Sequence, residues 1–156
     1  MRNIMIRLMN ENDIDDVSEL LRQVNLVHHL IRPDIFKKNN KYNKEELKEL
    51  INDNNYHIFV YDDGKVIGHA FCIDKIIKDD NLLMDIKTLY IDDICVDENN
   101  RGKGVARSLF NYVKEFAKEN GYYNIELNVW EHNDSAKAFY EKMGLKPLKV
   151  TMEDIL

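Results

Sequence analysis

The amino-acid sequence predicts a single α/β (α+β) domain built around a mixed sheet. Its 156 residues are a usual length for one domain, and no internal repeat, low-complexity segment or linker divides them. Some stretches alternate apolar and polar residues, as half-buried strands do. Others carry apolar residues every three or four positions, as amphipathic helices do. Along residues 1–156 these patterns give the order β-α-α-β-β-β-α-β-α-β.

The first predicted elements are a strand and a helix. Apolar residues occupy alternate positions over residues 3–8, which indicates a strand. Asn10 is suited to cap a helix, because its side-chain oxygen can accept a hydrogen bond from the first turn. The apolar stripe of this helix extends to Val24, and the pattern then weakens until Pro33 interrupts any further helix.

A loop, a short helix and three strands follow. Residues 34–42 are expected to form a loop anchored by Phe36. Asn43 and the glutamate three positions later have the spacing of a capping box, which predicts a short helix. Strands are then expected over residues 56–61 and 66–76, joined by an Asp-Gly hairpin turn. A third strand lies within residues 82–96, after a polar turn.

The C-terminal third alternates helices and strands. A long helix begins at Val105 and ends at the Asn-Gly pair before a strand over residues 123–129. Asn133 or the following aspartate caps a last helix, which runs to Met143. Residues 146–155 are predicted to form a final strand, whose proline suits a strand start or a sheet edge.

The composition is that of an ordinary globular protein. The net charge of −6 disfavours a general nucleic-acid binder and is compatible with a cationic substrate. Cys72 and Cys95 lie in apolar runs and are expected to be reduced core residues of a cytoplasmic protein. No cysteine or histidine spacing indicates a metal, and no apolar run indicates a signal peptide or a membrane span.

The chain is organised around a strand, a glycine-bearing loop and the start of a helix. The run Y-I-D-D-I-C-V is followed by the loop residues Arg101, Gly102, Lys103 and Gly104. The first turn of a helix has backbone N–H groups without partners, and glycines let a phosphate approach them. Together with Arg107, the loop predicts a pyrophosphate site, although a βα loop with two glycines is also a common structural connection.

A second stretch, N-D-S-A-K-A-F-Y-E-K-M-G-L, covers residues 133–145. Phe139, Tyr140 and Met143 share one helix face, which is typical of a core stripe. Tyr140 differs from its neighbours, because a buried hydroxyl needs a hydrogen-bond partner.

Together these stretches resemble the GNAT (Gcn5-related) superfamily of N-acetyltransferases, which use acetyl-CoA. The pattern Q/R-x-x-G-x-G/A appears as N-N-R-G-K-G, and N-x-x-A-x-x-F-Y-x-x-x-G-F appears as the stretch at 133–145. The resemblance covers the whole chain as one domain, 1–156, and implies a mostly antiparallel sheet flanked by helices. Asn99 departs from the pattern and would lose one phosphate contact, for which Arg101 and Lys103 would compensate.

The resemblance implies a binding site for acetyl-CoA. Strand backbone would bind the pantetheine, loop amides and basic side chains the pyrophosphate, and an asparagine the pantetheine amide. The residues so assigned are Ile94, Cys95, Val96, Arg101, Gly102, Lys103, Gly104, Val105, Ala106, Arg107 and Asn133.

The resemblance also implies two catalytic residues. Tyr140 would protonate the leaving thiolate. The run Y-I-D-D-I-C-V is similar to Y-L-E-D-I-Y-V of diamine acetyltransferases, where the glutamate matching Asp92 is linked to amine binding and deprotonation. Strand alternation predicts that at most one of Asp92 and Asp93 faces the cleft. Alternatively, both aspartates only end a polar strand edge or pair with lysines, and Glu131 and His132 are further candidate bases.

Four residues are candidates for contact with the acceptor substrate. They are His28, His29, Asp93 and Trp130. The expected acceptor is the primary amine of a small molecule, such as a polyamine, an aminoglycoside or an amino acid, with direct transfer in a ternary complex. Two alternatives remain: a peptide or protein N-acetyltransferase of the ribosomal-protein type, and an acetyl-CoA-binding module without turnover. The resemblance also implies a homodimer, and neither a nucleic acid, a membrane nor a metal is expected as a partner.

Overall fold

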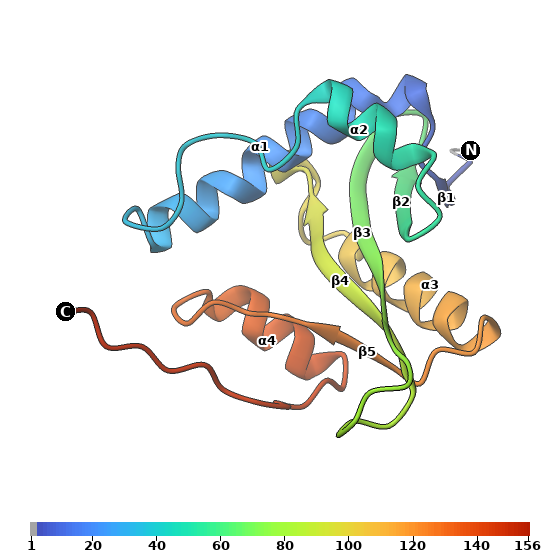
Figure 1. Ribbon diagram of the computed structural model, residues 1–156. Helices are drawn as coiled ribbons and strands as arrows, with labels where there is room; N and C mark the ends of the chain where they lie inside the picture. Colours follow the sequence, from blue (N-terminus) through green and yellow to red (C-terminus); the bar gives the residue numbers. More distant parts are fainter. Residues whose placement is uncertain (1–2) are drawn as a thin grey trace.

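A five-stranded sheet with helices on both faces forms the protein, as the computed structural model describes it over residues 3–156 (Figure 1). The strands are β1 Met5–Leu8, β2 Tyr56–Asp62, β3 Val66–Ile77, β4 Ile86–Val96 and β5 Asn124–Leu127. The helices are α1 Ile14–Ile31, α2 Lys44–Ile51, α3 Val105–Glu119 and α4 Asp134–Lys142, and the short 3-10 turns are η1 Glu11–Asp13 and η2 Glu98–Asn100.

The sheet is mixed and mostly antiparallel, as the sequence predicts. Strands β1 to β4 pair with their neighbours in antiparallel fashion, whereas β5 pairs with β4 in parallel. Parallel neighbours need a crossover, which α3 provides. Pairing between β4 and β5 ends at Ile91 opposite Leu127, where β5 itself ends, and the chain that follows runs away from β4 (Figure 1).

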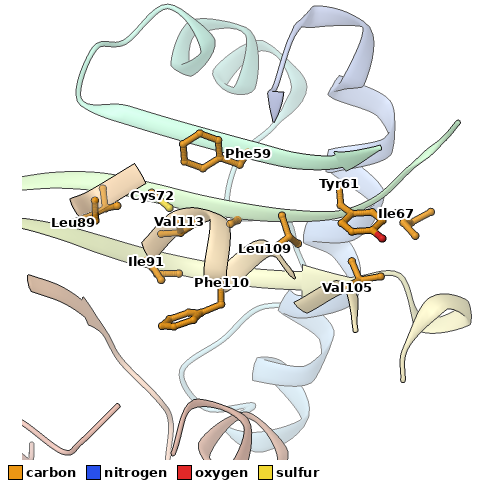
Figure 2. Close-up of a cluster of buried hydrophobic side chains, with 12 residues drawn as sticks. Phe59, Tyr61, Ile67, Cys72, Leu89, Ile91, Val105, Leu109, Phe110 and Val113 are labelled. Carbon is orange, nitrogen blue, oxygen red and sulfur yellow. The ribbon is translucent and has the colours of Figure 1, made fainter. Parts of the chain in front are cut away.

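Two apolar layers hold the helices against the sheet. On one face α3 contributes Leu109 and Val113, which are fully buried against strand side chains such as Leu89 (Figure 2). On the other face Leu21 of α1 and Leu47 of α2 are equally buried. Burying apolar side chains on both faces supplies the main favourable free energy of such a sheet.

Local signals mark the ends of several elements where the sequence predicts them. The Asn10 side chain accepts a hydrogen bond from the Asn12 N–H at 2.9 Å and caps the turn η1. Asn43 and Glu46 exchange both bonds of a capping box, at 2.8 and 3.1 Å, before α2. Gly64 has a φ of 106° in the β2–β3 hairpin, a backbone conformation that glycine adopts without strain.

The predicted final strand at residues 146–155 is wrong. These residues form no strand, and the alternating apolar side chains Leu148, Val150 and Met152 are 69, 77 and 85% exposed. The alternation selects an extended backbone, but a strand also needs a sheet edge to pair with, and the segment runs past α4 instead (Figure 1). Its Glu153 pairs with Arg32, just beyond the end of α1. The homodimer implied by the resemblance stays a prediction.

Candidate functional site

The loop before α3 presents unpaired backbone N–H groups. Gly102 and Gly104 have φ values of 77° and 79°. Gly104 occupies the N-cap position of α3 and, being a glycine, has no side chain that could bond the free amides of the helix. The Ser108 N–H bonds the Gly104 carbonyl at 3.0 Å, so among residues 3–156 the three amides before it, 105–107, have no backbone acceptor. A Cβ atom added at either glycine would meet nothing within 4 Å. An anion can therefore approach these amides closely.

The charges around this loop favour an anion as well. Arg101, Lys103 and Arg107 are all exposed, and the first turn of α3 contains no acidic residue. The positive end of the helix macrodipole adds to their potential. Asn99 lies exposed in η2, and the loss of one phosphate contact at this position stays a prediction. The loop thus has the shape and the charge that a pyrophosphate requires.

A buried glutamine of α1 braces the same loop. Gln23 is 6% exposed and donates a hydrogen bond to the Asp97 carboxylate at 2.9 Å. Its side-chain oxygen accepts one from the Glu98 N–H at 3.0 Å. The bond from Gln23 holds the pKa of Asp97 below its usual range. Sequence reasoning missed Gln23, although a polar residue between the apolar positions of the first helix was a usable signal.

Strand β4 offers a free edge next to the loop. Its pairing with β5 stops at Ile91, so from residue 92 to the end of the strand the edge that faces β5 has no strand partner within residues 3–156. Ile94 and Val96 pack toward the α3 layer, whereas Cys95 packs on the α1 face with its Sγ 3.2 Å from the Leu20 carbonyl oxygen. Burial raises the pKa of Cys95 to about 12, which keeps the thiol neutral. The backbone of residues 94–96 is therefore what this edge presents to a ligand.

A β-bulge places both aspartates of β4 on one face. Asp93 lies opposite Phe71 in β3 while Ile91 lies opposite the next residue, so Asp92 is an extra residue in the strand. Asp92 accepts two bonds from Lys41 Nζ, at 2.7 and 2.6 Å. Asp93 accepts one from His69, whose ring packs at 6.1 Å from Phe71 in the α1–α2 layer. The bulge thus interrupts the strand alternation from which the sequence predicts opposite faces for the two aspartates.

His69 is the second functional residue that sequence reasoning missed. Its ring is fully buried, and its Nδ1 atom has no hydrogen-bond partner within residues 3–156. Because a carboxylate only accepts, the Nε2–H of His69 donates to Asp93. Asp93 is thereby held by a buried histidine of the sheet, whereas Asp92 is held by a lysine from a surface loop. A histidine inside an otherwise apolar strand was the signal for this pair.

Three of the predicted acceptor-contacting residues contact Phe36, two of them through its ring and one through its backbone carbonyl. Phe36 lies 5.1 Å from the ring of His28 and 5.1 Å from that of Trp130. The Nδ1–H of His29 donates to the Phe36 carbonyl at 2.6 Å. Burial lowers the pKa of His28 below its usual range, so its ring is neutral at pH 7. The loop anchor predicted at Phe36 is confirmed, and it joins the end of α1 to the segment after β5.

Tyr140 lies on the other side of the sheet, half-buried against the α3 layer. Its ring packs at 6.5 Å from Phe110, and its hydroxyl has no hydrogen-bond partner among residues 3–156. Burial, and secondarily the charge of Asp93, raise the pKa of Tyr140 far above its usual range. Asn133 occupies the cap position of α4 but makes no side-chain cap bond. Both polar groups are therefore available to a ligand.

Other kinds of site find no support in residues 3–156. These residues contain no group of three or more histidine, cysteine or acidic side chains arranged to hold a metal ion. None of their helices has both the length and the hydropathy needed to cross a bilayer. Glu131 and His132, the further candidate bases, are exposed in the loop before α4.

Comparisons with known proteins agree on one family. A family model described as the acetyltransferase (GNAT) family matches residues 24–145. An uncharacterized N-acetyltransferase of Methanocaldococcus jannaschii is 28% identical over 149 residues, which cover 93% of this chain and 62% of that protein. This chain spans only 55 to 62% of the length of the curated relatives that it matches first.

Solved structures share the whole fold. A single-substitution mutant of the BH1408 protein of Bacillus halodurans superimposes with a TM-score of 0.92 at 31% identity, covering 97% of this chain and 99% of that one. An aminoglycoside N-acetyltransferase solved in complex with CoA has a TM-score of 0.73 at 16% identity, covering 100% of this chain and 96% of its own. The second likeness shows the fold alone.

The brace from α1 can be tested by replacing Gln23 with leucine. The variant leaves Asp97 and the Glu98 N–H without their partner, so we expect the free energy of unfolding to fall by about 1–3 kcal/mol. Urea denaturation measures the change. The neighbouring Arg22, which forms only an exposed pair with Glu19, is the control, and Arg22→Ala should shift stability by at most about 0.5 kcal/mol. Equal stabilities of the two variants would contradict the brace.

Proposed function

The chain belongs to the acetyltransferase (GNAT) family, and we propose that it is an N-acetyltransferase that moves the acetyl group of acetyl-CoA to the primary amine of a small molecule. Transfer is direct, within a ternary complex of protein, acetyl-CoA and amine. The observation that carries the proposal is the free edge of β4, which leads from the paired aspartates to the glycine loop.

Acetyl-CoA fits this edge from end to end. The backbone N–H groups of residues 102–107 bind the pyrophosphate, and Arg101, Lys103 and Arg107 add charge. The unpaired backbone of residues 94–96 bonds the pantetheine as an added strand would. The free side chain of Asn133 reaches the same arm from the start of α4. The thioester then lies where the pairing of β4 with β5 ends.

Three groups perform the chemistry at that point. Most of an alkyl amine with a pKa of ~10 is ammonium at pH 7, so it must lose a proton before it attacks. Asp92 accepts this proton, directly or through a water. The N–H of Ile94 or Cys95 stabilises the oxyanion of the tetrahedral intermediate. Burial raises the pKa of Tyr140 and so keeps it neutral, and its hydroxyl can donate a hydrogen bond to the departing thiolate of CoA, whose thiol has a pKa of ~8.5.

The surroundings of the carboxylates favour a small cationic acceptor. Asp92 and Asp93 lie together, and the aromatic cluster of His28, Phe36 and Trp130 stands at the end of α1. Carboxylates attract an ammonium group, and aromatic faces bind the carbon skeleton and the charge of such a molecule. Proteins of the same fold include an aminoglycoside acetyltransferase solved in complex with sisomicin.

The reaction is tested by following free CoA thiol released from acetyl-CoA in the presence of different amines. The panel contains putrescine, spermidine, aminoglycosides, single amino acids and basic peptides. We expect turnover with one of the small cations. Turnover with basic peptides alone would replace the small acceptor by a peptide. Binding of acetyl-CoA, followed by thermal shift, without any turnover would contradict the enzymatic function.

Tyr140→Phe tests the proton donor. Removing the hydroxyl takes away the group that stabilises the leaving thiolate, so kcat should fall about 100-fold while the Kd for acetyl-CoA is unchanged. Steady-state kinetics and calorimetric titration give the two values. Tyr112→Phe is the matched control, because Tyr112 lies on α3 and packs on Phe59 away from the loop. An unchanged kcat in Tyr140→Phe would reduce this tyrosine to a packing residue.

Gly104→Val tests the pyrophosphate loop. A branched side chain at a φ of 79° costs on the order of 1–3 kcal/mol unless the backbone turns, and turning moves the amides away from the ligand. We expect the affinity for acetyl-CoA to fall roughly tenfold or more. Gly64→Val is the control, since its φ of 106° imposes similar strain in the β2–β3 hairpin, outside the glycine loop. Equal loss of affinity in both variants would refute the loop assignment.

A further inference from the structure

The loop between α1 and α2 delivers a primary amine to the candidate base. Lys41 Nζ lies 2.7 Å from Oδ1 and 2.6 Å from Oδ2 of Asp92, so its ammonium engages both oxygens. The Asp92 side chain is only 9% exposed, whereas that of Lys41 is 47% exposed. A solvent-facing lysine therefore reaches inward to a carboxylate that the bulk solvent barely contacts.

The chain on either side of Lys41 is anchored. The side chain of Asn40 donates to the Ser18 carbonyl oxygen of α1 at 3.0 Å. The ring of Tyr42 stacks on Phe71 of the sheet, with centroids 5.2 Å apart and planes 14° apart. The ammonium of Lys41 lies 5.7 Å from the centroid of the same Tyr42 ring. These contacts fix the backbone from which the lysine reaches Asp92.

Asp92 marks the end of the free edge of β4. It is the bulge residue, and the last pair between β4 and β5 lies just before it, at Ile91. An acetyl-CoA molecule bound along residues 94–96 brings its thioester to this end of the edge. Lys41 Nζ consequently occupies the position in which the proposed function places the ammonium of an external acceptor.

We propose that Lys41 is an internal acceptor, to which bound acetyl-CoA transfers its acetyl group when no external amine is present. The inference rests on the proposed function. The Lys41 ammonium gives a proton to Asp92, and the freed nitrogen lone pair attacks the thioester carbonyl carbon. A C–N bond forms, the C–S bond breaks, and the thiolate leaves as CoA after taking a proton from Tyr140. The second proton that the nitrogen loses restores Tyr140, and the proton on Asp92 passes to solvent. One amide, one thiol and one proton released to solvent account for all atoms.

Acetylation changes the site in a defined way. The Nζ atom of acetylated Lys41 is an uncharged amide nitrogen, which no longer forms an ion pair with Asp92. The carboxylate is then free for the ammonium of an external acceptor. An external amine and Lys41 compete for the same position beside the Asp92 carboxylate, so the external amine slows the acetylation of Lys41.

The experiment incubates the full chain with acetyl-CoA alone and maps acetylation by peptide mass spectrometry. We expect one acetyl group, on Lys41, formed at a rate independent of protein concentration. Lys44 is the internal control, because it pairs with Asp15 at 2.8 Å on the exposed surface and should stay unmodified. Lys41→Arg keeps the positive charge and should abolish the modification. Asp92→Asn should slow it about 100-fold.

The outcomes separate the inference from the proposed function. Acetylation of Lys41 and Lys44 at equal rates would mean that acetyl-CoA modifies lysines without selection by the site, and it would overturn the inference. Binding of acetyl-CoA, seen by thermal shift, without acetylation of Lys41 also overturns it and leaves the proposed function standing. Failure of acetyl-CoA to bind at all overturns both.

Discussion

The bulge at Asp92 in β4 is the feature on which the rest of the site depends. It interrupts the alternation of the strand, so two consecutive carboxylates lie on the α1 face. It also coincides with the end of β4–β5 pairing, beyond which the edge of β4 is free up to the glycine loop. One irregularity thus aligns the proposed base, the proposed backbone binding edge and the proposed anion site along a single strand. Bulges next to functional sites commonly redirect side chains in this way.

The two carboxylates are stabilised by different partners, and this difference suits different roles. Asp93 accepts a hydrogen bond from His69, whose side chain is fully buried in the sheet and is fixed by its packing. Asp92 is paired with Lys41, which belongs to a surface loop and can be replaced by another ammonium. A fixed carboxylate shapes the potential of the site, whereas a carboxylate with an exchangeable partner is suited to bind and deprotonate an incoming amine.

Much of the fold and the anion loop could be predicted from local sequence. The capping box at Asn43, the hairpin at Gly64 and the glycines at 102 and 104 each act over a few residues, so their signals are legible. The orientation of Asp93 could not be predicted, because it depends on the register of β3 against β4. The brace by Gln23 links residues 74 positions apart. The prediction of a final strand was wrong because it also depends on distant residues: the alternation of apolar residues does not reveal whether a sheet edge lies near enough to pair with.

Backbone amide signals in nuclear magnetic resonance spectra, followed while acetyl-CoA is added, test the proposed binding site most directly. Binding along the free edge predicts the largest shifts at residues 92–96 and 102–107. Only small shifts are expected at the hairpin around Gly64, which lies outside the loop and the free edge. Shifts confined to other parts of the sheet, or none at saturating acetyl-CoA, would contradict the central claim that this edge and this loop form the acetyl-CoA site.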